Sequence, residues 1–180
     1  MSEDNSFLFA EYAKPVAKRG KNRRMRALLI LCYCLFAGGY AVFFASITVP
    51  QVIAILPVFV WMLVYFTWGI VNYECCVRVA SGKVVFLKLK GKKEKELYSF
   101  HARDILFACP YNEAGKRKIA EASITKTMDF RADPEKDGYA MLLSREGGTA
   151  LIRFECTVAV ANAMRYYNKE VLVDKEFLPL

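Results

Sequence analysis

Cysteine and histidine are the residues of this sequence that could bind a metal ion or supply a nucleophile and its base. The only histidine is His101, in the segment FHARD, where it could pair with Cys109 or Cys156 as base and thiol. The cysteines show no CxxC spacing and no histidine at the spacing of a zinc site; they are Cys32, Cys34, Cys75, Cys76, Cys109 and Cys156. We therefore expect no metal site and interpret His101 as a surface loop residue, with the Cys–His pair as the alternative.

Two of these cysteines, Cys75 and Cys76, are adjacent in the segment NYECCVRV. Its β-branched and aromatic residues are typical of a strand, in which neighbouring side chains point to opposite faces of a sheet. The two thiols are therefore not expected to share a metal ion or to form a disulfide with each other. In a reducing compartment they stay free, one of them facing inward. Attachment of a lipid to one of these thiols is the alternative.

No catalytic or cofactor-binding motif is visible elsewhere in the chain. The glycine pair of REGGTA lies between two predicted strands, which indicates a turn rather than a phosphate-binding loop. The acidic segment DFRADPEKDG resembles a calcium loop only loosely, because it lacks the ligand spacing and contains Pro134. The sequence thus predicts no catalytic residue, no metal and no cofactor.

The elements that position these residues begin with a long uncharged block. From Ala27 to Val71 the chain contains no Asp, Glu, Lys, Arg or His, and about 20 apolar residues are enough to cross a bilayer. Pro50, in the segment TVPQV, lacks a backbone donor and marks the break between two helices. We predict a transmembrane hairpin of two helices, residues 27–47 and 51–71, each roughly 30 Å long.

Basic residues flank this block on both sides. We interpret residues 1–26 as a basic cytoplasmic tail, and Arg78 and Lys83 follow the second predicted helix. Positively charged flanks stay in the cytoplasm, so we expect a multi-pass protein of the cell membrane with both termini in the cytoplasm. The net charge of +8 is also compatible with nucleic-acid binding. Because the basic cluster adjoins a membrane segment, we assign it to topology and expect no nucleic-acid partner.

Small residues recur along one side of the first predicted helix. Ala37, Ala41 and Ala45 fall at every fourth position, and such a stripe lets two helices approach closely. We interpret the stripe as the contact with the second helix. The alternative is a contact with a protein partner or with a second copy of the chain.

After Tyr73 the pattern changes to short strand segments separated by turn signals such as Ser81-Gly82. Seven segments are predicted to be strands, and Thr157 precedes a predicted helix from Val158 to Val171. The segments are YECCVRVA, KVVFLKLK, KELYSF, ILFACPY, SITKTMDF, GYAMLLSR and TALIRFEC. We expect an α+β protein in which residues 72–180 form a seven-stranded antiparallel β-sandwich or barrel with a C-terminal helix.

Seven antiparallel strands followed by one helix is the order of the pleckstrin-homology (PH) fold. The segments NYECCVRVASGKVVFLKLKGKKEKEL and RFECTVAVANAMRYYNK show this order at its two ends. The chain resembles small bacterial two-helix membrane proteins of unknown function with a bacterial PH-like domain. This resemblance implies a membrane-tethered binding or scaffold domain. It does not imply phosphoinositide binding, because the first loop of the domain is only Ser81-Gly82, with Lys83 beyond it.

Clustered basic residues are the expected contacts with anionic lipid headgroups, and solvated hairpin tips are the alternative. They are Lys18, Arg19, Arg23, Arg24, Arg26, Lys92, Lys93, Lys116, Arg117 and Lys118. The leading hypothesis is a membrane-anchored, non-enzymatic binding or scaffold protein whose partners are membrane lipids. The alternatives are a subunit of an oligomeric transport or channel assembly and a small membrane enzyme that uses His101 with a cysteine.

Overall fold

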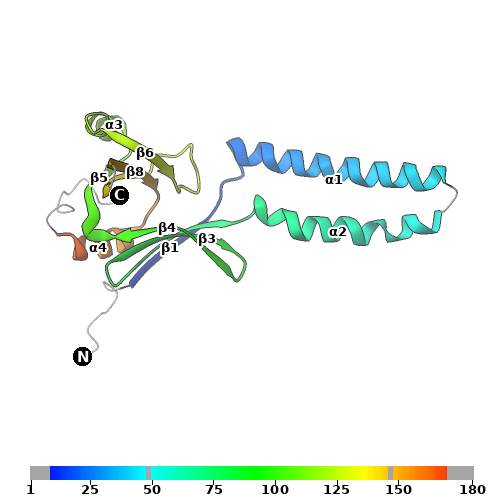
Figure 1. Ribbon diagram of the computed structural model, residues 1–180, viewed down its shortest axis with the longest axis horizontal. Coiled ribbons are helices and arrows are strands. Elements are labelled where there is room, and N and C mark those ends of the chain that lie inside the picture. Colours follow the sequence, from blue (N-terminus) through cyan, green and yellow to red (C-terminus); the bar gives the residue numbers. More distant parts are fainter. Residues whose placement is uncertain (1–8, 48–49, 146–147, 170–180) are drawn as a thin grey trace, which may run out of the picture. The chain divides into compact units, whose positions relative to one another are not determined.

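The computed structural model describes residues 9–47, 50–145 and 148–169. The chain forms two compact units (Figure 1). One unit combines the segment before Val16 with the chain from Glu74 onward, and the other is Val16–Tyr73. The helical unit is therefore an insertion within the sequence of the β unit.

Four antiparallel strands form the first sheet, sheet A, in the order β1-β2-β3-β4. Ser81 (φ 49°) and Gly82 (φ 76°) make the tight turn between β2 and β3, where positive φ angles suit the twist of a two-residue hairpin. Gly91 (φ 58°) lies in the turn between β3 and β4. The strands are β1 (Phe9–Pro15), β2 (Glu74–Ala80), β3 (Lys83–Lys90) and β4 (Lys93–His101).

The second sheet, sheet B, has the order β5-β7-β8-β6, and β6 runs parallel to β8. This corrects the expectation of an entirely antiparallel domain. β5 and β6 are the two edge strands of this sheet, so the chain between them must cross from one edge to the other, and it contains α3 (Glu113–Ala120), which was not predicted. The strands are β5 (Ile105–Pro110), β6 (Ile124–Asp129), β7 (Tyr139–Arg145) and β8 (Gly148–Phe154).

The sequence of α3 explains both its ends and its packing. The side chain of Asn112 accepts a hydrogen bond from the backbone N–H of Gly115 at 2.8 Å and caps the helix. Ile119 and Gly115 are buried on the face that covers the outside of sheet B, where Ile119 joins an apolar cluster with Cys109 and Leu142. The charged residues of α3 take the opposite face, so the helix is a surface element with a short apolar contact.

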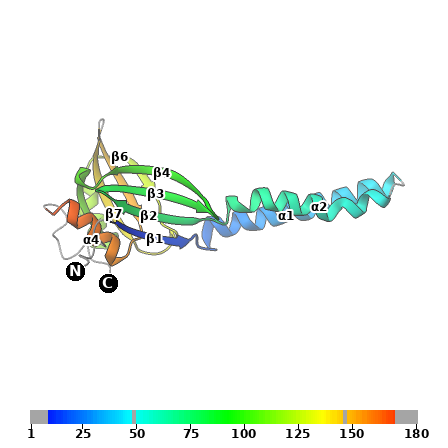
Figure 2. The same cartoon turned by 90° about the horizontal axis from the view of Figure 1, so that it is seen from below.

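The main core lies between the two sheets and α4 (Val158–Tyr167), as Figure 2 shows from a second direction. Phe86 of sheet A and Phe154 of sheet B meet there with ring centroids 5.9 Å apart. From α4, Val160 and Met164 are fully buried, as the helical spacing predicts. The PH-like β-sandwich with a C-terminal helix is thus present, but the helix ends at Tyr167, before the predicted end at Val171.

The described residues contain eight strands, so the predicted number of seven is wrong. Each of the seven predicted segments overlaps one of the strands β2 to β8. The additional strand is β1, from the segment that we interpreted as part of a basic tail. Ala10 and Tyr12 point from β1 into the core while Glu11 points outward, which is the alternation of a half-buried strand.

The helical unit contains α1 (Gly20–Ser46), which begins before the predicted start at residue 27. The predicted second helix, 51–71, is divided into the 3₁₀ helix η2 (Pro50–Ile55), the α-helix α2 (Leu56–Thr67) and the 3₁₀ helix η3 (Trp68–Ile70). The change from η2 to α2 lies next to Pro57, which lacks the N–H that an α-helix needs in its interior. Residues 48–49, part of the expected turn, lie outside the described residues.

Polar contacts join α1 to the helices that follow it, and Figures 1 and 2 show α1 and α2 side by side. Tyr33 and Thr67 share a hydrogen bond of 2.5 Å between their hydroxyl groups. The hydroxyl of Tyr40 donates to the carbonyl of Val52 at 3.1 Å. Ala37 and Ala41 are half-buried and lie on the same side of α1 as Tyr33 and Tyr40, whereas Ala45 is exposed.

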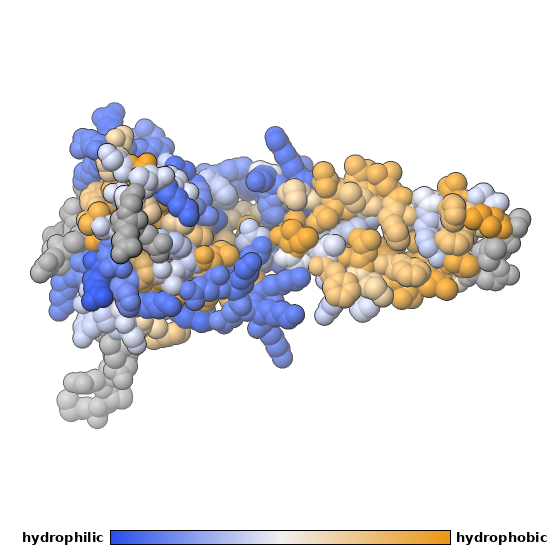
Figure 3. All heavy atoms as spheres, viewed as in Figure 1, coloured by the Kyte–Doolittle hydropathy of each residue, from blue (hydrophilic) through white to orange (hydrophobic). Residues whose placement is uncertain are grey.

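Most large apolar side chains of the helical unit are exposed, and Figure 3 shows them as a hydrophobic surface along α1 and α2. In α1 only Tyr33 is buried among the described side chains. By length and composition α1 could cross a membrane, while Leu56–Ile70 is a shorter apolar helical stretch. An apolar helix buried in a soluble core would instead hide most of its side chains.

Candidate functional site

Lysines gather at one end of sheet A, which we call the basic end: Lys14, Lys88, Lys90, Lys92, Lys93 and Lys95. The strand register makes one row of Lys14, Cys75, Lys88 and Lys95, because each residue is the Cα partner of the next. Partners in a ladder lie on the same face of the sheet. The row therefore brings together lysines from three strands that are far apart in the sequence.

The row lies on the face of sheet A that covers the core. Residues two positions apart in a strand lie on the same face of the sheet. Cys75 therefore shares a face with Val77 of β2, and Lys88 shares a face with Phe86 of β3. Val77 and Phe86 are both buried in the core. The apolar core thus ends at the row, and the lysines form the rim of the sandwich. Lys90, Lys92, Lys93 and Lys95 are exposed, which leaves their ammonium groups accessible from outside.

One lysine of the row has a strong internal partner. The ammonium group of Lys14 donates a hydrogen bond to the carboxylate of Glu155 and forms an ion pair with it. This hydrogen bond raises the pKa of Lys14 above its ordinary value. Glu155 also accepts a hydrogen bond from the backbone N–H of Asp133 at 3.0 Å. Lys14 therefore fixes β1 to the end of β8 in addition to its place in the row.

The two adjacent cysteines lie on opposite faces of β2, as predicted. Cys75 belongs to the lysine row, and burial raises the pKa of its thiol to about 11. Cys76 is 1% exposed, and its thiol donates a hydrogen bond of 3.2 Å to the carboxylate of Glu11. Burial and this hydrogen bond raise the pKa of Cys76 to about 12. Both thiols are therefore protonated at neutral pH and poor nucleophiles.

An ion-pair network covers the outer face of sheet A near these cysteines. The guanidinium of Arg78 contacts the carboxylate of Glu11 at 3.1 Å and that of Glu94 at 2.9 Å. The hydrogen bonds from Arg78 lower the pKa of both carboxyl groups. The network links β1, β2 and β4 across the sheet, and the positive charge of Arg78 is paired with the two carboxylates.

The other predicted basic contacts lie in separate places. Lys92 and Lys93 belong to the basic end, while the side chains of Lys116, Arg117 and Lys118 are exposed on α3, where Lys116 pairs with Glu113 at 2.8 Å. In the helical unit the side chain of Arg26 donates to the carbonyl of Val71 at 2.9 Å. Four more predicted contacts in that unit are exposed: Lys18, Arg19, Arg23 and Arg24.

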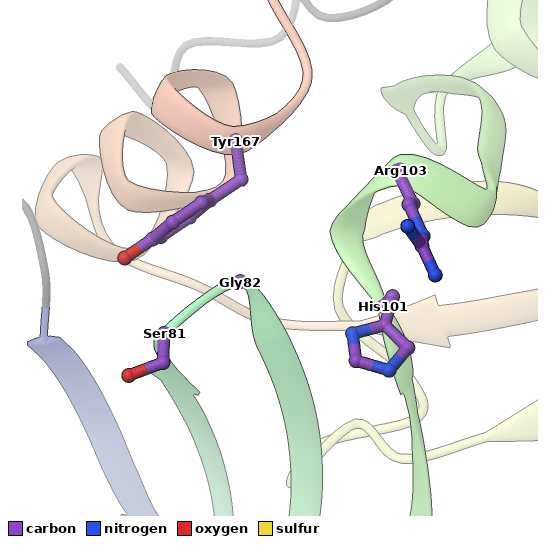
Figure 4. Close-up of a pocket in the computed structure, with 5 residues that line it drawn as sticks. All are labelled: Ser81, Gly82, His101, Arg103 and Tyr167. Carbon is purple, nitrogen blue, oxygen red and sulfur yellow. The ribbon is translucent and has the colours of Figure 1, made fainter.

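A pocket of about 240 Å³ lies at the opposite end of sheet A, beside the turn between β2 and β3 (Figure 4). It is lined by Ser81, Gly82, His101, Arg103 and Tyr167. His101 is exposed, as predicted, but it is the last residue of β4 rather than a loop residue. Arg103 follows it in the 3₁₀ helix η4 (Ala102–Asp104). Sequence reasoning missed this pocket because Tyr167 comes from the distant helix α4.

The proposed pair of His101 with a cysteine has no counterpart in the part of the chain that the structure describes. No cysteine lines the pocket, and no hydrogen bond joins His101 to Cys109 or Cys156 among the described residues. Burial raises the pKa of Cys156 to about 12, which is unfavourable for a nucleophile. The described residues also contain no group of three or more metal-binding side chains.

Sequence reasoning missed the row that joins Lys14, Lys88 and Lys95, because their proximity depends on the pairing of β1 with β2 and of β3 with β4. The alternation of residues 9–14, FAEYAK, was the available signal for β1. With that strand recognised, an antiparallel partner would have been required near Glu74. The lysine-rich turn between β3 and β4 would then have been placed at the same end of sheet A as Pro15 and Glu74.

Comparisons with known proteins agree with this architecture. Residues 8–174 match the family described as "Bacterial PH-like domain (DUF6106)", so the match includes β1, the helical unit and both sheets. No curated protein and no solved structure matches the chain. Since the match extends over almost the whole sequence, the chain belongs to the bacterial PH-like domain family DUF6106.

Proposed function

We propose that this protein is a non-enzymatic binding or scaffold protein, anchored in the cell membrane by its helical unit. In this proposal α1 and the stretch η2–α2–η3 cross the membrane as a hairpin, with both termini in the cytoplasm. The basic end of sheet A contacts anionic lipid headgroups at the inner surface. The pairing of Pro15 with Glu74 is the observation on which the topology depends.

Pro15 and Glu74 are Cα partners in the antiparallel ladder of β1 and β2. The chain leaves the sheet after Pro15 and returns to it at Glu74, so both points lie on the same side of any membrane. Within the helical unit, the backbone N–H of Val16 likewise donates to the carbonyl of Tyr73 at 3.0 Å. A chain that leaves and returns on one side crosses an even number of times. If α1 crosses, the following helices must cross back.

The dimensions of the helical unit support two crossings. An α-helix of the 27 residues of α1 is about 40 Å long, against about 30 Å of bilayer hydrocarbon. The stretch Pro50–Ile70 contains a shorter α-helix, but 3₁₀ segments rise about 2 Å per residue, which extends it to roughly 35 Å. The exposed apolar side chains of both stretches would then face lipid instead of water.

The charge distribution supports the inner surface as the site of contact. The lysine row of the basic end is adjacent to the pair of Pro15 and Glu74, because Lys14 precedes Pro15 and its partner Cys75 follows Glu74. Each lysine near an anionic leaflet contributes about 1 kcal/mol of attraction. The lysines of the turn between β3 and β4 therefore lie at the edge of the domain that the connections bring to the membrane. The exposed basic residues at the start of α1 have the same preference.

Reporter fusions to the full chain test this topology. Alkaline phosphatase, which is active outside the cytoplasm, and a fluorescent protein that folds inside are fused in turn to each terminus. We expect fluorescence and no phosphatase activity from both ends, with a fusion inserted between residues 48 and 49 giving the opposite result. Reporters on opposite sides would disprove the even number of crossings. Whether the stripe of Ala37, Ala41 and Ala45 contacts a second copy of the chain stays a prediction. Crosslinking between copies of the chain in the same cells tests it.

A further inference from the structure

The pocket beside the β2–β3 turn has a backbone held by hydrogen bonds from three elements. The backbone N–H of Ala102 donates to the carbonyl of Gly82 at 2.8 Å. The buried side-chain amide of Asn168, which follows α4, donates to the carbonyls of Ala102 at 2.9 Å and Ile105 at 3.1 Å. The turn, η4 and α4 are thus fixed to one another before any ligand binds, which reduces the entropy lost on binding.

The side chains that line this pocket are mainly hydrogen-bond donors. The carboxylate of Asp104 accepts the backbone N–H of His101 at 3.2 Å, which fixes the start of η4. The imidazole of His101 carries at least one N–H in either tautomer. That N–H, the guanidinium of Arg103 and the hydroxyl of Ser81 are therefore available, and no carboxylate is among the lining residues.

Arg103 is the cation of the pocket. Its side chain is 80% exposed, and its contact with the neighbouring Asp104 is 3.9 Å long, near the limit for an ion pair. A planar guanidinium that is held so weakly can turn to bind an oxyanion through two parallel N–H groups. In Figure 4 the side chain of Arg103 extends toward the ring of His101. The two donors therefore converge on one region of the pocket.

Tyr167 supplies an apolar wall next to these donors. A Cβ atom on Gly82 would lie 3.2 Å from Cδ1 of Tyr167, so the missing side chain lets the ring pack over the turn. Figure 4 shows the ring beside Gly82, on the side away from His101 and Arg103. An aromatic face next to oxyanion donors suits a ligand with an organic body and one anionic group.

We infer that this pocket binds the phosphate or carboxylate group of a soluble organic anion, with Arg103 and His101 as donors and Tyr167 against its organic part. The oxyanion site itself follows from the pocket alone. The choice of a soluble ligand over a lipid rests on the proposed function. β2 runs from Glu74 to the pocket, so the pocket is at the end of sheet A opposite the connections to the apolar helices.

Calorimetric titration of the full chain in non-ionic detergent tests the site, with phenyl phosphate and benzoate as probes. We expect saturable binding of at least one probe, weakened at least tenfold by Arg103→Gln. His101→Phe, which keeps a ring but removes the donor, should also weaken binding. Lys126→Gln is the matched control, because it removes one exposed positive charge on β6. Absence of saturable binding, or equal weakening by the control, would overturn the inference.

A second arm separates the two sources of an oxyanion. The full chain is placed in lipid nanodiscs with or without a phosphorylated inositol lipid, and phenyl phosphate is titrated again. Equal affinity in both discs supports a soluble ligand. Loss of phenyl phosphate binding only in discs that contain this lipid would show that the lipid occupies the pocket, and would overturn the choice of a soluble ligand. The reporter fusions decide the proposed topology separately, since a failed topology leaves Arg103-dependent binding in detergent unchanged.

Discussion

Lys14 of β1 donates a hydrogen bond to the carboxylate of Glu155, which directly follows β8. The two residues come from opposite ends of the described chain, and the pair joins sheet A to sheet B. It also lies next to Pro15, the last residue before the helical unit. The pair therefore holds the strand that determines where the insertion starts.

Glu155→Gln should loosen β1. The amide keeps an oxygen that can accept from the backbone of Asp133, but it loses the charge that pairs with Lys14. Because Lys14 is partly exposed, we expect a loss of about 1 kcal/mol in the free energy of unfolding. Urea unfolding of the full chain in detergent, followed by circular dichroism, measures it. The exposed Glu121→Gln is the control, and equal stability of the two variants would contradict the role of the pair.

The Arg78 network predicts a loss of stability in acid. Arg78 lowers the pKa of Glu11 in the folded state below its unfolded value of about 4.3. A lowered carboxyl pKa contributes stability above the unfolded value, and this contribution is lost as the pH falls through the folded pKa. Glu11→Gln should therefore reduce the unfolding free energy by about 0.2–1 kcal/mol at pH 7. A difference from the unsubstituted chain that persists undiminished at pH 3 would speak against this origin.

Local sequence signals were sufficient to predict most strands of the β unit and the buried face of α4. β2 to β8 have alternating or β-branched residues and turn signals such as Ser81-Gly82, and Val160 and Met164 identify the buried face of α4. These features depend on residues close together in the sequence, which is why they could be predicted.

Features that depend on distant contacts could not be predicted in this way. β1 is short, adjoins a basic cluster and finds its partner only beyond the helical unit, at Glu74. α3 has only Ile119 and Gly115 buried, too few for a clear helical period. The parallel pairing of β6 with β8, the lysine row and the pocket at Tyr167 all follow from the assembled sheets.

The basic end should respond to lipid charge. We expect slower amide hydrogen exchange in residues 90–95 when the full chain is in nanodiscs with anionic lipid than in discs with zwitterionic lipid, because lysines approach an anionic surface. The double variant Lys92→Glu/Lys93→Glu should remove this difference in exchange rate. Salt at 0.5 M should reduce it, because the electrostatic screening length is then only about 4 Å. Lys126→Glu/Lys136→Glu, with the same charge change elsewhere, is the control. Protection that survives the first double variant would refute the contact.

Three thiols of the β unit should be unreactive at neutral pH. Burial raises the pKa to about 11 in Cys75 and to about 12 in Cys76 and Cys156. Since the thiolate is the reactive form, maleimide at pH 7.5 should label these residues at least a hundredfold more slowly than in the unfolded chain. Mass spectrometry of digested peptides measures each site, with urea-unfolded protein as the control. Rapid labelling of Cys76 in the folded chain would contradict its burial on β2.

Gly115→Ala should destabilise the contact between α3 and sheet B. A Cβ at this position would lie 2.1 Å from the carbonyl oxygen of Pro110 and 3.0 Å from the sulfur of Cys109, so the helix must move away from β5. Forced displacement of this kind costs about 1–3 kcal/mol. Gly39→Ala in α1 is the matched control, because a Cβ there meets no atom within 4 Å. Thermal unfolding of both variants in detergent should show a lower midpoint for Gly115→Ala only. Equal midpoints would mean that α3 does not pack against β5 as closely as these distances require.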